Sequence, residues 1–354
     1  MLNNIFLKIV LFPFYMIYVF LINLRNYLYS AGFLKQKKLD KKVISVGNIT
    51  AGGTGKTPFT IMLSEKLIDE FGLKPCILSR GYKRDKESEI LVVEENCSFV
   101  KCGDEPVLIK SRLKDKACVI VGKNRYKSAK EFEKKCGCGV FVLDDGYQHR
   151  KLFRDINICL VDCSNPFGNG KIIPYGILRE PVFEIKRADI IVLTRAKYAK
   201  NLTLLRKTVE AINPLAKIFE ANLEISHFFQ PATGNIIALE DMQDKKVISF
   251  AAVGNPLSFK ADLITAGLNV VKSYSFKDHA VPSYEKLEKL NAVANEEKVD
   301  YIVATEKDWV KLKEEKTLEI FGKKLTICIS NMLLSREKDF LKYLEERLND
   351  KRDS

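Results

Sequence analysis

Short apolar runs alternate with longer amphipathic stretches along most of the chain after Lys42. The runs are rich in Val and Ile and predict buried strands at residues 43–46, 76–78, 118–121, 140–143, 156–161, 190–193, 247–251, 270–274, 302–304 and 325–329. The amphipathic stretches predict helices at residues 56–71, 105–113, 124–135, 259–266, 283–295 and 337–348. Apolar strands that alternate with helices are typical of a doubly wound α/β fold with a parallel sheet.

The same pattern divides the chain into a larger and a smaller α/β part. Between them, a stretch with Pro231, Gly234 and many polar side chains favours a connector or a hairpin. The predicted order is an N-terminal segment, a first domain, the connector and a second, smaller α/β domain, at residues 1–29, 30–227, 228–245 and 246–354.

An apolar segment precedes the first predicted strand. Residues 5–24 are nearly all aliphatic or aromatic, with Lys8 and Pro13 as interruptions, and are followed by Arg25 and by lysines at 35, 37, 38, 41 and 42. A helix needs ~20 apolar residues to cross a bilayer, so we expect a membrane anchor that either spans the bilayer or lies in its interface. The basic residues predict that this side faces the cytoplasm and attracts anionic phospholipids. A buried core helix is the alternative, and a cleavable signal peptide is disfavoured because no small-residue cleavage site follows.

The composition is that of a globular protein with an excess of positive charge. Of the 354 residues, 46% are hydrophobic and 29% are charged, which excludes wholesale disorder, a collagen-like repeat and a disulfide-knotted mini-fold. The formal net charge of +13 predicts attraction to nucleic acid, a phosphorylated ligand or an acidic membrane surface. Nucleic acid is disfavoured, because the sequence has neither a basic patch with interleaved aromatic residues nor a zinc finger.

The cysteines are odd in number and irregular in spacing, which indicates a reducing compartment and unpaired thiols. They are Cys76, Cys97, Cys102, Cys118, Cys136, Cys138, Cys159, Cys163 and Cys328. Cys136 and Cys138 could begin a metal site. No second close pair follows them, and the chain has only three histidines, so a zinc site is disfavoured.

The most informative segment is a predicted strand, a glycine-rich turn and the start of a helix at residues 43–58. This order is typical of a phosphate-binding loop (P-loop), in which backbone N–H groups and a helix N-terminus face phosphate oxygens. Lys56 would neutralise phosphate charge, and Thr57 would bind Mg²⁺. The strict pattern has glycine where Thr50 stands, so the loop is a variant, and an ordinary strand-to-helix turn is the alternative. The predicted nucleotide-binding residues are Thr50, Ala51, Gly52, Gly53, Thr54, Gly55, Lys56 and Thr57.

A P-loop needs an acidic side chain on a neighbouring strand to hold magnesium directly or through water. Asp144 and Asp145 follow the apolar run at residues 140–143, so we expect both carboxylates at the carboxyl edge of a buried strand, where doubly wound sheets bind ligands. A hairpin turn at Asp-Gly is the alternative. Asp162, which ends the next predicted strand, is a rival with one carboxylate, and we prefer the doubled acid.

Several further strings accompany the P-loop along the chain. They are Ser-Arg-Gly-Tyr at 79–82, Gly-Asp-Glu-Pro at 103–106, Gly-Lys-Asn-Arg at 122–125, Asp-Asp-Gly-Tyr-Gln-His at 144–149, Gly-Asn-Gly-Lys-Ile-Ile-Pro at 168–174, Leu-Arg-Glu-Pro at 178–181 and Asp-His at 278–279. Each string alone is weak, whereas the combination is specific. Together they resemble the tetraacyldisaccharide 4′-kinases of lipid A synthesis in Gram-negative bacteria, over nearly the whole chain and including the apolar N-terminal segment.

The resemblance implies a P-loop kinase domain at residues 30–227 that transfers the γ-phosphoryl group of ATP to the 4′-hydroxyl of an acylated glucosamine disaccharide 1-phosphate. It implies ATP and Mg²⁺ as cofactors, and this lipid and the surface of anionic phospholipids as partners. No nucleic acid and no obligate protein partner are implied. The catalytic domains would face the cytoplasm at the cell inner membrane.

The resemblance also implies roles for individual residues. Asp104 and His279 would activate the sugar hydroxyl, and Arg125 and Arg179 would stabilise charge. The residues around the metal and the phosphates would be Thr57, Asp144, Asp145, His149 and Glu180. The chain departs from many relatives at Ala280, where they carry a second histidine or another polar residue.

Other interpretations of these residues stay open. Without the resemblance, Asp104 is a good helix cap, and Arg179 with Glu180 is a surface ion pair. His227 belongs to no motif and is interpreted as structural. The alternative function is a membrane-associated P-loop ATPase that drives a partner protein, although such proteins often carry a lysine where Ala51 stands.

Overall fold

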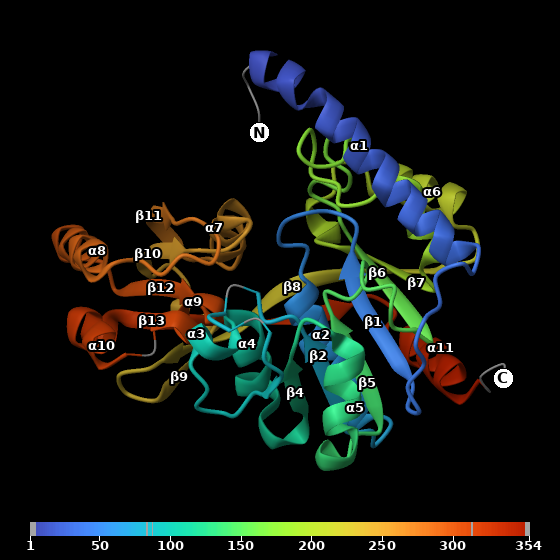
Figure 1. Ribbon diagram of the computed structural model, residues 1–354. Coiled ribbons are helices and arrows are strands. Elements are labelled where there is room, and N and C mark those ends of the chain that lie inside the picture. The colour runs from blue at the N-terminus through green and yellow to red at the C-terminus, as the bar shows by residue number, and fades with distance from the viewer. Residues whose placement is uncertain (1–4, 83, 87, 313, 351–354) are drawn as a thin grey trace.

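The computed structural model describes residues 5–82, 84–86, 88–312 and 314–350, so the first four residues of the predicted anchor lie outside it. The described strands form one large, mainly parallel sheet (Figure 1). They are β1 (Val43–Asn48), β2 (Pro75–Ser79), β3 (Leu91–Val92), β4 (Cys118–Val121), β5 (Val140–Asp144), β6 (Ile156–Asp162), β7 (Ile190–Thr194), β8 (Lys217–Gln230), β9 (Asn235–Ala238), β10 (Lys246–Ala251), β11 (Asn269–Ser275), β12 (Tyr301–Thr305) and β13 (Leu325–Leu334).

Helices cover both faces of the sheet. They are α1 (Ile5–Ser30), α2 (Lys56–Asp69), α3 (Phe99–Cys102), α4 (Asp104–Leu113), α5 (Arg125–Cys136), α6 (Leu202–Ile212), α7 (Pro256–Thr265), α8 (Tyr284–Glu296), α9 (Glu306–Leu312), α10 (Glu315–Phe321) and α11 (Glu337–Asn349). Short 3₁₀ helices are η1 (Lys114–Lys116), η2 (Val182–Arg187), η3 (Ala196–Tyr198), η4 (Glu240–Met242) and η5 (Gly322–Lys324). Every predicted strand and helix is present with small shifts at its ends, and β9 pairs with the end of β8 as a hairpin, one of the two alternatives predicted for this stretch. β3, the part of β8 before residue 228, α3, α6, α9 and α10 were not predicted.

The strand order is β11-β10-β12-β13-β8-β7-β6-β1-β5-β2-β4-β3, with β9 paired to β8. β1 lies between β5 and β6 and is parallel to both, so the carboxyl ends of these three strands meet at one edge. A doubly wound sheet binds its ligands at this edge. β8 is parallel to β7 and antiparallel to β13, and it therefore joins the two predicted parts in one sheet.

The last helix, α11, packs against the first part of the chain. The ring of Phe340 in α11 meets Phe59 of α2 and Phe219 of β8 edge to face, at centroid distances of 6.2 and 5.3 Å. In Figure 1, α11 accordingly lies near β7 and far from α8 and α10. The chain thus returns to the first part after β13, and the domain division at 228–245 stays a prediction.

The N-terminal helix α1 leaves most of its apolar surface exposed (Figure 1). Exposed side chains include Val10, Phe12, Phe14, Met16, Ile17, Phe20 and Leu21. The stretch Val10–Ser30 is long and apolar enough to cross a membrane, by length and composition, and only 6% of its apolar window is buried. A buried core helix is therefore excluded. Tyr15 stacks near Tyr175 with ring centroids 4.6 Å apart, and the carbonyl of Asn26 accepts from Arg150 at 2.9 Å, which fixes α1 to the body.

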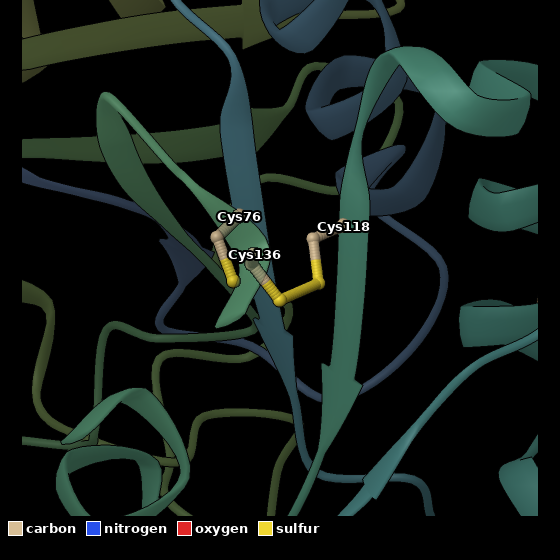
Figure 2. A group of neighbouring side chains, drawn as sticks. All are labelled: Cys76, Cys118 and Cys136. Carbon is tan, nitrogen blue, oxygen red and sulfur yellow. A yellow bond between two sulfur atoms is a disulfide. The ribbon is translucent and has the colours of Figure 1, made fainter. Parts of the chain in front are cut away.

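The expectation of unpaired thiols is wrong for four cysteines, because the structure joins Cys97 to Cys102 and Cys118 to Cys136. The free and buried ones are Cys76, Cys138, Cys159, Cys163 and Cys328. Cys118 begins β4, and α5 runs back along the sheet to end at Cys136, so the two meet at the same edge (Figure 2). The sequence spacing could not show this return of the helix.

Candidate active site

One cavity of about 910 Å³ opens at the carboxyl edge of the parallel strands. Three parts of the chain line it: α1 through Arg25, the P-loop through Lys56, and the loops that follow β10 to β12 through His279. The same cavity therefore reaches from the predicted phosphate site to the helix with the exposed apolar surface.

The P-loop connects β1 to α2 and brings its lysine to the start of the helix. Gly55 precedes α2 with a φ of 85°, a left-handed conformation that favours glycine. Lys56 and Thr57 are the first residues of α2 and lie at the positive end of the helix dipole. The Lys56 Nζ atom lies 3.4 Å from Oδ1 of Asn48 and 3.8 Å from Oδ1 of Asp145. This lysine thus has two oxygen neighbours, one on β1 and one directly after β5.

Thr50 and Ala51, the first two predicted nucleotide-binding residues, lie outside the described lining of the cavity. The Thr50 hydroxyl accepts a hydrogen bond from the Asn48 amide at 3.0 Å. The backbone N–H of Ala51 donates to the carbonyl of Ile177 at 2.6 Å. The other six predicted residues, Gly52, Gly53, Thr54, Gly55, Lys56 and Thr57, all line the cavity.

Asp145 is the carboxylate that faces the P-loop. It follows β5 with a φ of 50°, and its two oxygens accept from Nη1 of Arg179 at 2.9 and 2.8 Å. Burial alone would raise the pKa of Asp145, but the charges of Lys56 and Arg179 lower it below its ordinary value. Asp145 is therefore ionised at neutral pH and can bind a divalent cation.

Asp144 has a different environment from its neighbour. It is buried and accepts from the hydroxyls of Thr60 at 3.3 Å and Ser79 at 3.2 Å. Burial, followed by the negative charges of Glu105 and Asp145, raises the pKa of Asp144 to about 7. The predicted pair thus consists of one ionised carboxylate and one that titrates near neutral pH.

His149 and Arg125 line the same cavity. Burial and the positive charges of Arg125 and Arg154 lower the pKa of His149 to about 3, so its imidazole is neutral at physiological pH. The Nε2 atom of His149 is buried and has no hydrogen-bond partner among the described residues. A ligand in the cavity could supply that partner.

Glu180 does not join this group, and the structure corrects its expected place around the metal. It is fully buried, with Oε1 2.5 Å from Arg25 of α1 and Oε2 2.5 Å from Arg187 of η2. Two guanidinium groups thus occupy both carboxylate oxygens. The alternative, a surface ion pair with Arg179, is also wrong, because Arg179 binds Asp145 instead. Glu180 ties α1 to the body beside the cavity.

Asp104 and His279 meet although they are 175 positions apart. The Nδ1 atom of His279 lies 2.8 Å from Oδ2 of Asp104, which is 6% exposed. Burial alone would raise the pKa of Asp104, but the hydrogen bond from His279 and the charge of Lys307 lower it. Asp104 is therefore ionised and can accept a hydrogen bond from Nδ1 of His279, whose Nε2 atom lies 3.7 Å from Oδ2 of Asp278.

The two members of this pair have different positions. His279 lines the cavity, whereas Asp104 is absent from the described lining and lies at the first residue of α4. Its Oδ1 atom also accepts from the backbone N–H of Glu105 at 2.9 Å. Gly103 is the N-cap residue of α4, so the interpretation of Asp104 as the N-cap is wrong, although its Oδ1 atom still accepts from an N–H of the first helical turn.

Lys307 is a site residue that the sequence analysis missed. It lies in α9 directly after β12, and its Nζ atom lies 3.1 Å from Glu105, 3.5 Å from Asp278 and 3.9 Å from Asp104. Burial would lower the pKa of Lys307, but these three carboxylates raise it above its ordinary value. The available signal was the charged string Thr-Glu-Lys-Asp at 305–308, immediately after an apolar run.

Gly254 was missed as well. A Cβ atom placed on Gly254 would lie 2.8 Å from the backbone nitrogen of Gly53 in the P-loop. The loop after β10 therefore approaches the P-loop as closely as only glycine allows. This contact closes the cavity between the two parts of the chain.

Asp162, the rival carboxylate, lies outside the part of the cavity lining that the structure describes. It ends β6, forms an ion pair with Arg195 and accepts from the Ser164 hydroxyl at 2.7 Å. Asp145, beside Lys56, is thus the better-placed acid for a nucleotide-bound cation.

A lysine at the start of the P-loop helix, an ionised aspartate on the adjacent strand and an Asp–His pair at the same cavity define a P-loop phosphotransferase. The family model for tetraacyldisaccharide-1-P 4′-kinase matches residues 7–349. The chain belongs to this family.

Relatives and a solved structure support the same family. A tetraacyldisaccharide 4′-kinase from Halothermothrix orenii is 34% identical over 335 residues, covering 90% of this chain and 86% of the relative. One from Elusimicrobium minutum is 33% identical and covers 96% of this chain and 91% of the relative. The crystal structure of LpxK from Aquifex aeolicus in complex with ATP has a TM-score of 0.75 at 31% identity, covering 97% of this chain and 99% of that chain. The predicted fold class and family are confirmed.

Proposed function

We propose that this enzyme transfers the γ-phosphoryl group of ATP to the 4′-hydroxyl of a tetraacyldisaccharide 1-phosphate in lipid A biosynthesis. The observation that carries this function is the single cavity that brings together the P-loop, His279 and α1. A kinase needs the first two, and a lipid acceptor accounts for the third. Membership of the family and the similarity to an ATP-bound relative support the same reaction.

The residues around the P-loop fit a magnesium ion bound with ATP. The Thr57 hydroxyl and the ionised Asp145 carboxylate are oxygen donors in one cavity with Lys56, and Mg²⁺ prefers oxygen ligands. When bound, Mg²⁺ supplies positive charge to the phosphates. Asp144 and His149 lie beside this group and are proposed to hydrogen-bond its water or phosphate ligands. Glu180 is left out of the metal site, because two arginines hold it.

The protein's own cations and the Asp–His pair carry the proposed chemistry. Lys56, Arg125 and Arg179 neutralise charge on the phosphates as it develops in the transition state. The 4′-hydroxyl oxygen bonds to the γ-phosphorus while the bond to the β–γ bridging oxygen breaks and ADP leaves. The hydroxyl proton passes to Nε2 of His279, and Asp104 stabilises the resulting imidazolium through Nδ1.

The acylated substrate requires contact with a membrane, and we propose that α1 provides it. The basic residues after α1 favour the cytoplasmic side of the cell inner membrane. The lysine cluster contributes less than the sequence suggests. Lys42 lies 3.7 Å from Asp155, and Lys37 lies over the Tyr126 ring, so both already contact the protein.

Phosphoryl transfer by the purified enzyme is expected to require the lipid. With ATP and Mg²⁺, phosphate incorporation into tetraacyldisaccharide 1-phosphate should proceed at a rate typical of kinases, ~1–100 s⁻¹, and ADP release should fall to background without lipid. The deacylated disaccharide 1-phosphate is the matched control and should be a much poorer acceptor. ATP hydrolysis that is unaffected by the lipid would instead favour the ATPase that drives a partner protein.

Membrane binding is expected to depend on the exposed aromatic residues of α1. Replacing Phe12, Phe14 and Phe20 together by serine removes about 2 kcal/mol of apolar transfer free energy each, so vesicle partitioning should fall by roughly 10⁴-fold. Flotation with anionic phospholipid vesicles at high salt measures this, because salt screens the lysines. The matched control replaces Leu215, Ile236 and Leu257, which lie elsewhere and are even more exposed, by serine. If the α1 variant floats like wild type, the membrane contact lies elsewhere.

A further inference from the structure

Three cysteines meet at the edge of the sheet opposite the active site. Cys76 in β2 and Cys118 at the start of β4 are register partners on neighbouring parallel strands, near the amino ends of both. Cys136 ends α5 beside them. The three Sγ atoms all lie within 4.8 Å of one another (Figure 2). Since the active site lies at the carboxyl ends of the strands, this cluster is not part of it.

Cys138 supplies a fourth thiol to the same place. It is buried, lies two residues after Cys136, and stands just before the start of β5. Glu133 lies one turn before the end of α5. Its buried Oε1 atom has no hydrogen-bond partner among the described residues. Three neighbouring sulfur atoms, a fourth buried thiol two residues further on and an unpartnered carboxylate oxygen on the same helix thus lie in this part of the chain.

This donor set matches one metal in particular. Structural zinc sites are tetrahedral and are commonly made of four thiolates, with Zn–S distances of about 2.3 Å, so neighbouring sulfur atoms lie about 3.8 Å apart. Three Sγ atoms within 4.8 Å of one another can reach that geometry by side-chain rotation. Harder metals prefer oxygen ligands such as carboxylates, whereas sulfur atoms dominate this group of side chains.

We propose that, in the reduced protein, Cys76, Cys118, Cys136 and Cys138 bind one zinc ion that holds β2, β4 and α5 together. The Cys118–Cys136 disulfide must first accept two electrons and two protons from a dithiol, which itself becomes a disulfide. Zinc then displaces the four thiol protons to solvent, and four Zn–S bonds form. The other two ligands, Cys76 and Cys118, lie on β2 and β4, which are neighbours in the sheet but far apart in the sequence. A search for a second close pair in the sequence therefore could not find them.

The test uses the untagged full-length protein. The protein is first reduced with dithiothreitol, and the reductant is removed by gel filtration in the absence of oxygen. Zinc chloride or cobalt chloride is then added, and a second gel filtration removes unbound metal. We expect about one zinc per chain by elemental analysis, and for cobalt the absorption bands of tetrahedral thiolate coordination. The variant Cys76→Ala with Cys136→Ala should lose this zinc. The matched variant Cys159→Ala with Cys328→Ala, which removes two buried thiols elsewhere, should retain it.

The proposal is overturned if the reduced wild-type chain retains no zinc, or if bound cobalt lacks thiolate bands. Equal zinc contents in the two double variants would overturn it as well. If the cluster variant fails to fold, the wild-type stoichiometry and cobalt spectrum still decide the question. The kinase assay has no part in this test. The zinc measurement therefore stands whether or not the proposed function is correct.

Discussion

Alanine in place of Lys56 is expected to lower kcat by roughly 10²- to 10³-fold, the usual cost of losing one charge-stabilising group in a transition state. Lys56 begins α2, and its Nζ atom lies 3.8 Å from Oδ1 of Asp145. The fold should be retained, because Asp145 keeps both hydrogen bonds from Arg179 and no buried charge becomes unpaired. The kinase assay measures the loss, and circular dichroism during heating checks the fold.

Lys289→Ala is the matched control for this substitution. Lys289 lies on α8, is 73% exposed and pairs with Glu285, so its loss should change the free energy of unfolding by less than ~1 kcal/mol and leave kcat unaltered. Wild-type activity in a folded Lys56→Ala enzyme would remove the P-loop lysine from the mechanism. If Lys56→Ala were inactive because it is unfolded, its thermal unfolding transition would be lost. The Lys289→Ala control should keep that transition.

The strands that carry the site were predictable from the sequence for a simple physical reason. β1 and β5 are buried along their whole length, so both are rich in apolar residues: β5 begins with four in a row, and three of the first four residues of β1 are Val or Ile. The glycine-rich turn before Lys56 marks a position where the backbone must adopt a left-handed conformation, as it does at Gly55. Local chemistry therefore sufficed to place the P-loop and Asp145 at one edge of a sheet.

Contacts between segments that are distant in the sequence could not be predicted from local patterns. Arg179 and Glu180 are adjacent in the sequence, but they lie in an irregular bend, in which neighbouring side chains can point in different directions. Arg179 therefore reaches Asp145, whereas Glu180 reaches Arg25 of α1. No local pattern could tell which of the two charges faces the phosphates.

The omitted strand β8 shows a different limit. Apolar and polar residues alternate at 219–226, the signal of a strand with one exposed face, but they adjoin no glycine-rich or acidic motif. β8 is nevertheless the strand that pairs with β7 on one side and β13 on the other. Because the sequence analysis missed β8, it did not predict that one sheet continues across the proposed domain division.

The Asp104–His279 pair gives the second large expected effect. Asp104→Asn and His279→Ala are each expected to lower kcat by roughly 10²- to 10⁴-fold, the range for losing acid–base help, with the KM for ATP nearly unchanged. Asparagine keeps an oxygen that can accept from the N–H of Glu105, so α4 should still begin at this position. Steady-state kinetics at varied ATP and saturating lipid measure both constants.

A control separates catalysis from helix capping. The Asn201 side chain accepts from the backbone N–H of Leu204 at 2.9 Å and caps α6 away from the cavity. Asn201→Ala should cost about 1 kcal/mol of stability and leave kcat unaltered. A loss of activity at Asp104 with no more destabilisation than this would therefore arise from the contact with His279.

The double variant Asp104→Asn with His279→Ala provides the decisive measurement. Because Oδ2 of Asp104 acts on the hydroxyl through the imidazole of His279, the carboxylate can contribute little once the imidazole is gone. Groups that act as one unit are non-additive, so the double variant should be little slower than the slower single variant. Losses that multiply in full would mean that the two side chains act independently. A large rise in the KM for ATP from either single change would place that residue in nucleotide binding and leave Asp104 only its hydrogen bond from the N–H of Glu105.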